Sequence, residues 1–302
     1  MKLVLVGSLG HVGRPLAELL VHKKHEVTVI TSKEERRAEI EALGAAAAVG
    51  SADDAAFLTA AFRGADAVYT MIPPTGAYTD PDLDVDRQVR ALGEAFAAAI
   101  AGSGVGRVVH MSSIGADLER GAGLLRLHHA MEQALNPLRA AITFLRPTGF
   151  YYNLLSYIPM IKARGSIAAN YGEDDVVSWV APSDIAEAAA EELETLLAAA
   201  RPGARKVRYV ASEEISCRET ARLLGEAIGK PDLPWIVIPG DQMKQGLIAA
   251  GLKPAIADGM VEMYAASRSG LIYQEYFRNR PALGRVKVKD FAREFAAAYH
   301  RA

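Results

Sequence analysis

Residues 2–13, KLVLVGSLGHVG, decide the fold. Residues 2–6 are a β-prone, mostly apolar run, and glycines follow at positions 7, 10 and 13. Such a run predicts a strand covered on both faces, as in a parallel sheet. Glycines between a strand and a helix permit a tight turn, the approach of a pyrophosphate to the backbone, and close helix–strand packing. The segment therefore predicts the first strand, phosphate loop and first helix of a dinucleotide-binding protein.

All seven residues of this loop are expected to contact the cofactor: Gly7, Ser8, Leu9, Gly10, His11, Val12 and Gly13. The N-terminus of the following helix offers free N–H groups and a dipole that favour phosphate. The alternative is a structural glycine turn in an α/β protein that binds no nucleotide.

Strands and helices continue to alternate after the loop. Further strands are expected at 25–30, 46–49, 67–72, 107–111, 141–145 and 207–210, and the second helix at 33–43. A strand that recurs after each helix predicts a doubly wound parallel sheet, a Rossmann fold of the α/β class.

The pattern changes after Tyr151, where segments are shorter and late helices are expected at 217–228, 241–250, 255–269 and 290–300. We expect a dinucleotide-binding domain over 1–153, with a later strand returning to its sheet within 176–212. Residues 154–302 are expected to form a smaller, interwoven lobe on the substrate side.

Composition excludes several classes of protein. The chain has 302 residues, with 34 basic against 36 acidic side chains, which gives no general attraction for nucleic acid or an anionic membrane. No apolar run reaches the roughly 18 residues of a membrane span, and the N-terminal run is too short for a secretory signal. A single cysteine, Cys217, excludes an intramolecular disulfide and a thiolate metal cluster. We expect a soluble cytoplasmic protein whose partner is a small molecule.

The end of the second expected strand selects the dinucleotide. Thr31 and Ser32 can donate hydrogen bonds, and Lys33 adds a positive charge, with arginines at 36 and 37 one turn later. Cations and hydroxyls at this place favour the 2′-phosphate of NADP, whereas a carboxylate favours the ribose of NAD. Because glutamates occupy positions 34 and 35, NAD remains possible, but NADP is the predicted cofactor.

Residues that follow other strands are expected at the same edge of the sheet, since open α/β sheets bind ligands at their carboxyl ends. The expected cofactor contacts there are Met71, Ile72, Pro73, Met111, Ser112 and Phe150. Ser113, Tyr78, Tyr151 and Trp179 are candidates for substrate binding. The alternative for the aromatic and methionine residues is a place in the core.

Metal and hydrolytic sites are not expected. His128 and Glu132 are spaced for one helix face, but no third ligand accompanies them, and no G-x-S-x-G turn occurs.

The glycine loop resembles that of the atypical short-chain dehydrogenase/reductases, in particular the NmrA-like group. Four further segments are similar to that group: FLTAAFRGADAV at 57–68, RVVHMSS at 107–113, TFLRPTGFYYN at 143–153 and VSWVAPSDIA at 177–186. The resemblance implies an NAD(P)-binding Rossmann fold along nearly the whole chain. It also places Ser51 near the adenine, where the family often has an aspartate.

In the wider superfamily a Tyr-x-x-x-Lys pair serves hydride transfer, and a glutamate commonly stands four residues after the lysine. Aligned on Glu132, Leu124 occupies the tyrosine position and His128 the lysine position. Leucine can neither donate nor accept a proton, so alcohol–ketone chemistry by that pair is not expected.

Two functional hypotheses follow from the resemblance. The first is an oxidoreductase that uses NAD(P)H to reduce a flat conjugated molecule of the quinone, azo or triarylmethane type. His128 would be the catalytic residue and contact the nicotinamide ribose, with His128 or His129 donating a proton. The alternative for His128 is a structural histidine bonded to a carbonyl. The second hypothesis is a non-catalytic NADP-binding redox sensor with a protein partner.

Overall fold

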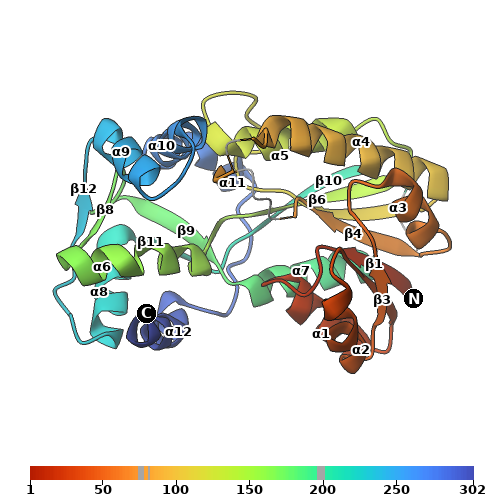
Figure 1. Cartoon of the computed structure of the whole chain (residues 1–302), viewed down its shortest axis with the longest axis horizontal. Coiled ribbons are helices and arrows are strands. Elements are labelled where there is room, and N and C mark those ends of the chain that lie inside the picture. Colours follow the sequence, from red (N-terminus) through yellow and green to blue (C-terminus); the bar gives the residue numbers. More distant parts are fainter. Residues whose placement is uncertain (74–77, 81, 196–200) are drawn as a thin grey trace.

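The computed structural model describes residues 1–73, 78–80, 82–195 and 201–302. Its main sheet has seven strands in the order β3-β2-β1-β4-β5-β6-β10, and each neighbouring pair is parallel. The strands are β1 (Lys2–Val6), β2 (Glu26–Thr31), β3 (Ala46–Val49), β4 (Ala67–Met71), β5 (Arg107–Met111), β6 (Ala141–Pro147) and β10 (Arg205–Val210). This arrangement confirms the predicted doubly wound α/β fold (Figure 1).

Helices cover both faces of the main sheet. They are α1 (Gly13–His22), α2 (Arg37–Ala42), α3 (Ala55–Phe62), α4 (Val85–Ser103), α5 (Arg126–Leu135) and α7 (Pro182–Thr195). Alternate residues of the strands point to opposite faces. Leu3, Leu5 and Tyr69 pack with α1, α2 and α7, whereas Val4 and Val68 pack with α3, α4 and α5. Burial on both faces explains the continuous apolar runs of β1 and β4.

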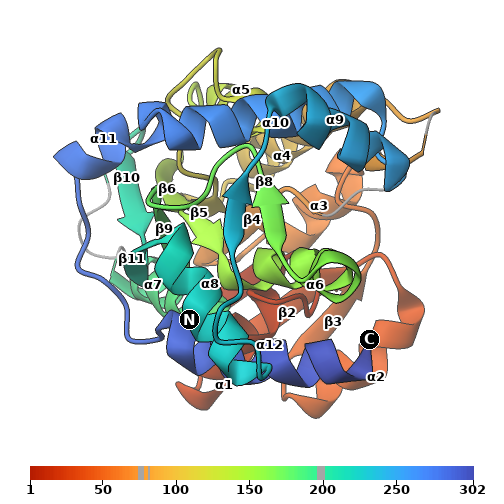
Figure 2. The same ribbon diagram turned by 90° about the vertical axis from the view of Figure 1, so that its left-hand side faces the viewer.

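The second half of the chain builds two small sheets beside the main one (Figure 2). One has the order β11-β9-β7, and the other pairs β12 with β8. Their strands are β7 (Gly149–Phe150), β8 (Ile167–Ala169), β9 (Val176–Val180), β11 (Glu213–Ser216) and β12 (Trp235–Val237). Sequence periodicity did not predict β7, β8 and β12, because two or three residues are too few to show an alternation.

Helices of this half enclose a separate apolar core that includes Tyr157, Trp235 and Phe295. They are α6 (Ile158–Arg164), α8 (Cys217–Ala227), α9 (Gly240–Ala249), α10 (Pro254–Arg268), α11 (Gln274–Arg278) and α12 (Val288–Arg301). Within the described ranges the 3₁₀ turns are η1 (Glu34–Arg36), η3 (Gly123–Leu125), η4 (Tyr151–Tyr157) and η5 (Leu271–Tyr273). The four late helices that the sequence predicted are confirmed to within a few residues.

Two boundaries differ from the prediction. The expected helix at 33–43 begins only at Glu34, because Lys33 is extended, with φ −119° and ψ 116°, and it consists of η1 followed by α2. Strand β6 continues through Pro147, whose carbonyl accepts the Ile114 N–H at 2.9 Å. A proline can end a strand because it loses only its own donor.

No helix within the described ranges is long and apolar enough to cross a membrane.

Candidate functional site

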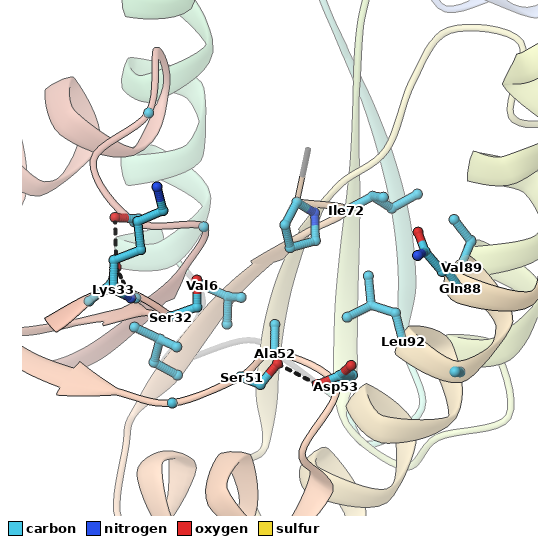
Figure 3. A pocket seen from close by; sticks show the side chains of 18 of the residues that line it. Val6, Ser32, Lys33, Ser51, Ala52, Asp53, Ile72, Gln88, Val89 and Leu92 are labelled. Atoms are coloured by element: carbon cyan, nitrogen blue, oxygen red, sulfur yellow. Dashed lines mark hydrogen bonds between the residues drawn. The ribbon is translucent and has the colours of Figure 1, made fainter. Parts of the chain in front are cut away.

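A cavity of about 890 Å³ opens at the carboxyl ends of β1, β2 and β4 (Figure 3). This volume is within the usual range of about 300–1,000 Å³ for ligand pockets. The strand order reverses between β1 and β4, and that point is where open α/β sheets bind their ligands. The lining comes from the glycine loop, the end of β2, the residues after β3 and β4, and the start of α4.

The glycine loop is fastened to β2. Gly7 has φ +114° and Ser8 φ +57°, both in the left-handed region. The Ser8 N–H donates to the Ile30 carbonyl at 3.0 Å, and its hydroxyl donates to Thr31 Oγ1 at 3.2 Å. Leu9 is buried in the core, so it borders the cavity mainly with its backbone. These contacts hold the loop open toward the cavity.

Gly10 and Gly13 are glycines for different reasons. A Cβ on Gly13 would lie 2.1 Å from the Ser8 carbonyl oxygen, so the packing of α1 against the loop excludes a side chain. A Cβ on Gly10 would meet no protein atom closer than the Gly7 oxygen, at 3.8 Å. The protein itself does not need a glycine at position 10. A bare backbone beside a helix N-terminus is what a closely approaching pyrophosphate requires, so the loop fits a dinucleotide.

Lys33 and Arg36 line one end of the cavity. Arg36 donates to Glu39 at 2.9 Å, which holds its guanidinium beside the pocket. Arg37, by contrast, binds Glu34 through both Nε and Nη2, and neither of these two residues lines the cavity. A glutamate that binds the ribose would have favoured NAD. Glu34 is less suited to that role, because its carboxylate is already paired with Arg37. Two cations at this end fit the 2′-phosphate of NADP.

The opposite end of the cavity is largely apolar. Ala52 follows β3, and Val89 and Leu92 project from α4 (Figure 3). Ser51 lines the cavity as expected and donates its hydroxyl to Asp53. At the same wall the Gln88 Oε1 atom is buried and has no hydrogen-bond partner among the described residues. This end suits a flat heterocycle such as adenine, with polar groups at its rim.

Sequence reasoning missed the contribution of α4, including Gln88. The sequence feature that could have indicated it is Asp84, the N-cap of α4, whose side chain accepts from the N–H groups of Asp86 and Arg87. The first turns of α4 that follow this cap line the cavity.

His110, His128 and His129, near the carboxyl edge of the main sheet, differ in their hydrogen bonding. His129 Nδ1 contacts the Ala116 carbonyl at 2.9 Å, so the bond to a carbonyl that was considered for His128 belongs to His129. The Nδ1 atom of His129 is therefore committed to the backbone, and the expectation that His129 donates a proton remains a prediction that concerns its other nitrogen. His128 is partly exposed, and its Nδ1 is buried without a partner. Burial lowers the pKa of His128 to about 4 and that of His110 to about 3, so both rings are neutral at pH 7.

The side chain of Ser112 is not free for a cofactor, contrary to expectation. It is buried and donates to Glu132 Oε1 at 2.6 Å. Glu132 in turn accepts from Arg146 Nε at 2.9 Å and Nη2 at 2.7 Å. Ser113, the next residue, is partly exposed and keeps its candidate role.

Tyr151 and Trp179 are corrected from substrate-binding to core residues. Tyr151 is 1% exposed, stacks on Phe291 and donates to the Val286 carbonyl at 3.1 Å. Trp179 is 3% exposed, and its ring lies against Gly149. A covered ring face cannot stack on a substrate.

The remaining residues that were expected to contact cofactor or substrate lie over the glycine loop, in the core, at the cavity or at the surface. Met71 lies over the loop, since a Cβ on Gly7 would be 2.4 Å from its sulfur, whereas Met111 and Val12 are buried. Ile72 and Pro73 line the cavity with Thr31 and Ser32, and Tyr78 is 40% exposed.

An aromatic stack joins the loop to the second half of the chain. The His11 and Tyr152 rings are 4.1 Å apart, and the Tyr152 and Phe150 rings 5.0 Å apart. Tyr152 was not predicted as a site residue, because the sequence does not show that it reaches position 11.

Among the described residues, no group of three histidine, cysteine or acidic side chains is arranged to hold a metal ion.

Comparisons with known proteins agree with this geometry. The sequence profile of the family described as NAD(P)H-binding matches residues 7–195. The chain is 29% identical over 265 residues to the NAD(P)H azoreductase of Xenophilus azovorans, covering 87% of this chain and 86% of that protein. It is also 29% identical over 269 residues to a (4-alkanoyl-5-oxo-2,5-dihydrofuran-3-yl)methyl phosphate reductase of Streptomyces griseus, covering 89% and 88%.

A solved structure shares the fold. The Citrobacter sp. triphenylmethane reductase complexed with NADP(H) superposes with a TM-score of 0.74, at 20% identity, over 97% of this chain and 99% of that chain.

We expect Gly10→Ala to separate folding from cofactor binding. The new methyl group has room in the protein, so the free energy of unfolding should be unchanged or raised by up to about 1 kcal/mol. NADPH should bind at least about tenfold more weakly, because the methyl group meets the pyrophosphate. Gly13→Ala is the contrast and should lower the free energy of unfolding by about 1–3 kcal/mol. Chemical denaturation and calorimetric titration measure both; undiminished NADPH affinity in Gly10→Ala would contradict the assignment.

Replacing Lys33 tests the phosphate end of the cavity. Lys33→Ala should weaken NADPH binding about tenfold and leave NADH binding unchanged, because only NADPH carries the 2′-phosphate. Arg37→Ala is the matched control and should change neither affinity, since Arg37 is paired away from the cavity. An equal loss for both cofactors in Lys33→Ala would show that Lys33 does not read the phosphate.

Proposed function

The chain belongs to the NAD(P)H-binding family, and from this premise we propose that it is a reductase that uses NADPH to reduce a flat, conjugated small molecule. Acceptors of the azo, quinone or triarylmethane type are the proposed class. The names of the azoreductase and the triphenylmethane reductase support the first and third types.

The proposal rests on helix α5 and the turn before it. If the helix is aligned on Glu132, Leu124 falls at the position of the superfamily's catalytic tyrosine, and this leucine is buried. A Cβ on Gly259 of α10 would be 2.8 Å from Leu124 Cδ2, so the position is closely packed as well as apolar. Without a tyrosine, the site is poorly suited to reduce an isolated ketone, which needs a proton on its oxygen.

Conjugated acceptors do not need a strong acid from the protein. The bound cofactor would supply a hydride, which neutralises a cationic triarylmethane acceptor outright and leaves a quinone or azo acceptor with a negative charge that is spread over its conjugated system. Water can then provide the proton. Holding the acceptor flat against the donor face is the main task left to the protein, and proximity and orientation can account for much of the rate.

His128 is proposed to stabilise the developing negative charge. Because burial lowers its pKa to about 4, the ring is neutral at pH 7 and acts by donating a hydrogen bond. A neutral imidazole can polarise an electrophile in this way when its N–H is aimed at the developing charge. Phe150, Ser113 and Tyr78 are proposed to form the wall that holds the acceptor.

A panel of quinones, azo dyes and triarylmethane dyes tests the function. We expect NADPH-dependent turnover of at least one class, followed by loss of absorbance at 340 nm. His128→Leu should lower kcat about 10- to 100-fold and change KM for NADPH little, because one hydrogen bond to developing charge is removed. His129→Asn is the control and should keep kcat, since its amide can still reach the Ala116 carbonyl. NADPH binding without turnover across the panel would contradict the reductase and favour the sensor.

A further inference from the structure

Two buried ring nitrogens near the carboxyl edge of the main sheet have no hydrogen-bond partner in the part of the chain that the structure describes. They are His110 Nε2 and His128 Nδ1. His110 is fully buried on β5, one residue before its end, and His128 lies on α5. An unpartnered buried polar atom destabilises the folded chain, so two at one place call for an explanation.

The other nitrogen of His110 is bound. Thr70 and His110 are paired in register on β4 and β5, and Thr70 Oγ1 lies 2.9 Å from His110 Nδ1. Both side chains are completely covered. His110 is the partner that the structure gives to the Thr70 hydroxyl, so the hydroxyl proton is used only if Thr70 donates to Nδ1. His110 must then carry its own proton on Nε2.

The His110 Nε2–H needs an acceptor, and His128 Nδ1 needs a donor. His110 lies on the face of the sheet that α5 covers: its ring meets the Phe144 ring edge-on, and Phe144 shares a core with Leu127 and Met131 of α5. No direct hydrogen bond joins His110 to His128 among the contacts of the described residues, so one water molecule is the simplest link. Such a water accepts from His110 and donates to His128, which satisfies both unpartnered atoms.

We propose that Thr70 and His110 are positioning residues that fix the tautomer of His128, so that its Nε2 carries the proton and faces the acceptor. The chain runs from the Thr70 hydroxyl through His110 and one water to His128 Nδ1. This inference rests on the proposed function, in which His128 donates a hydrogen bond to developing negative charge. The other tautomer would turn a lone pair toward that charge and repel it.

Because the His128 ring is neutral, its tautomer decides which of its two nitrogens can donate a hydrogen bond. Burial keeps both rings uncharged at pH 7, and a neutral imidazole has one donor and one acceptor nitrogen. A bond made by one nitrogen therefore decides the role of the other. Leu127 and Met131 of α5 are buried in the core beside β4 and β5, which limits rotation of the helix face that carries His128.

Long-range ¹H–¹⁵N NMR spectra of the ¹⁵N-labelled full chain report the tautomer of each histidine directly. We expect His128 to be the Nε2–H tautomer in the wild type. His110→Phe and Thr70→Val should convert His128 to a mixture with the Nδ1–H form. His129 is an internal reference, because its Nδ1 bonds to a carbonyl and must be the donor. Its signals should show Nδ1–H in every variant.

Thr59→Val provides a matched substitution elsewhere. Thr59 bonds to the Ala55 carbonyl within α3, so its loss should leave His128 unchanged. A wild-type His128 in the Nδ1–H form, or an unchanged tautomer in both His110→Phe and Thr70→Val, would overturn the inference. Thr70→Val decides the matter if His110→Phe does not fold.

Kinetics add an independent measurement. With an acceptor that is turned over, Thr70→Val should lower kcat about three- to tenfold and leave KM for NADPH unchanged. An unchanged kcat despite a shifted tautomer would overturn the functional part of the inference. If no acceptor is turned over, the proposed function fails, and the NMR spectra still decide whether Thr70 and His110 fix the tautomer.

Discussion

The site depends on one close contact, between the start of helix α1 and the loop that precedes it. Gly13 lies so near the Ser8 carbonyl that any side chain would overlap it, and Ser8 is held to β2 by two hydrogen bonds. This contact brings the N-terminus of α1 against the carboxyl end of β1. The cavity then extends from the loop toward β2 on one side and α4 on the other. A phosphate site and two flanking surfaces follow from that single constraint.

A buried ion pair gives α5 its place at the same edge. Arg146 of β6 binds both carboxylate oxygens of Glu132, and Ser112 completes the network. Breaking a buried pair typically costs about 3–5 kcal/mol, because the remaining charge is left without a partner. The network joins β5, β6 and α5, and so it fixes the helix that carries His128.

The fold could be predicted from the sequence because its long-range order follows from local patterns. The inner strands of the main sheet, such as β1, β4 and β5, show mostly apolar runs, and the glycine loop marks where the first one ends. Local patterns also predicted that Gly10 and Lys33 would lie at the cavity, because each directly follows a predicted strand or its loop. Side-chain burial was harder to predict, as Trp179, Tyr151 and Ser112 show, because it depends on segments far away in the sequence. The pairing of Arg37 with Glu34, and of His129 with Ala116, could not be read from spacing alone.

A crystal structure of the chain with NADP⁺ tests the central claim most directly. We expect the pyrophosphate over residues 7–10, the adenine between Ala52 and Leu92, and the 2′-phosphate within hydrogen-bonding distance of Lys33 and Arg36. The nicotinamide should reach the edge near His128. A cofactor bound elsewhere, or a 2′-phosphate directed away from both cations, would contradict the account.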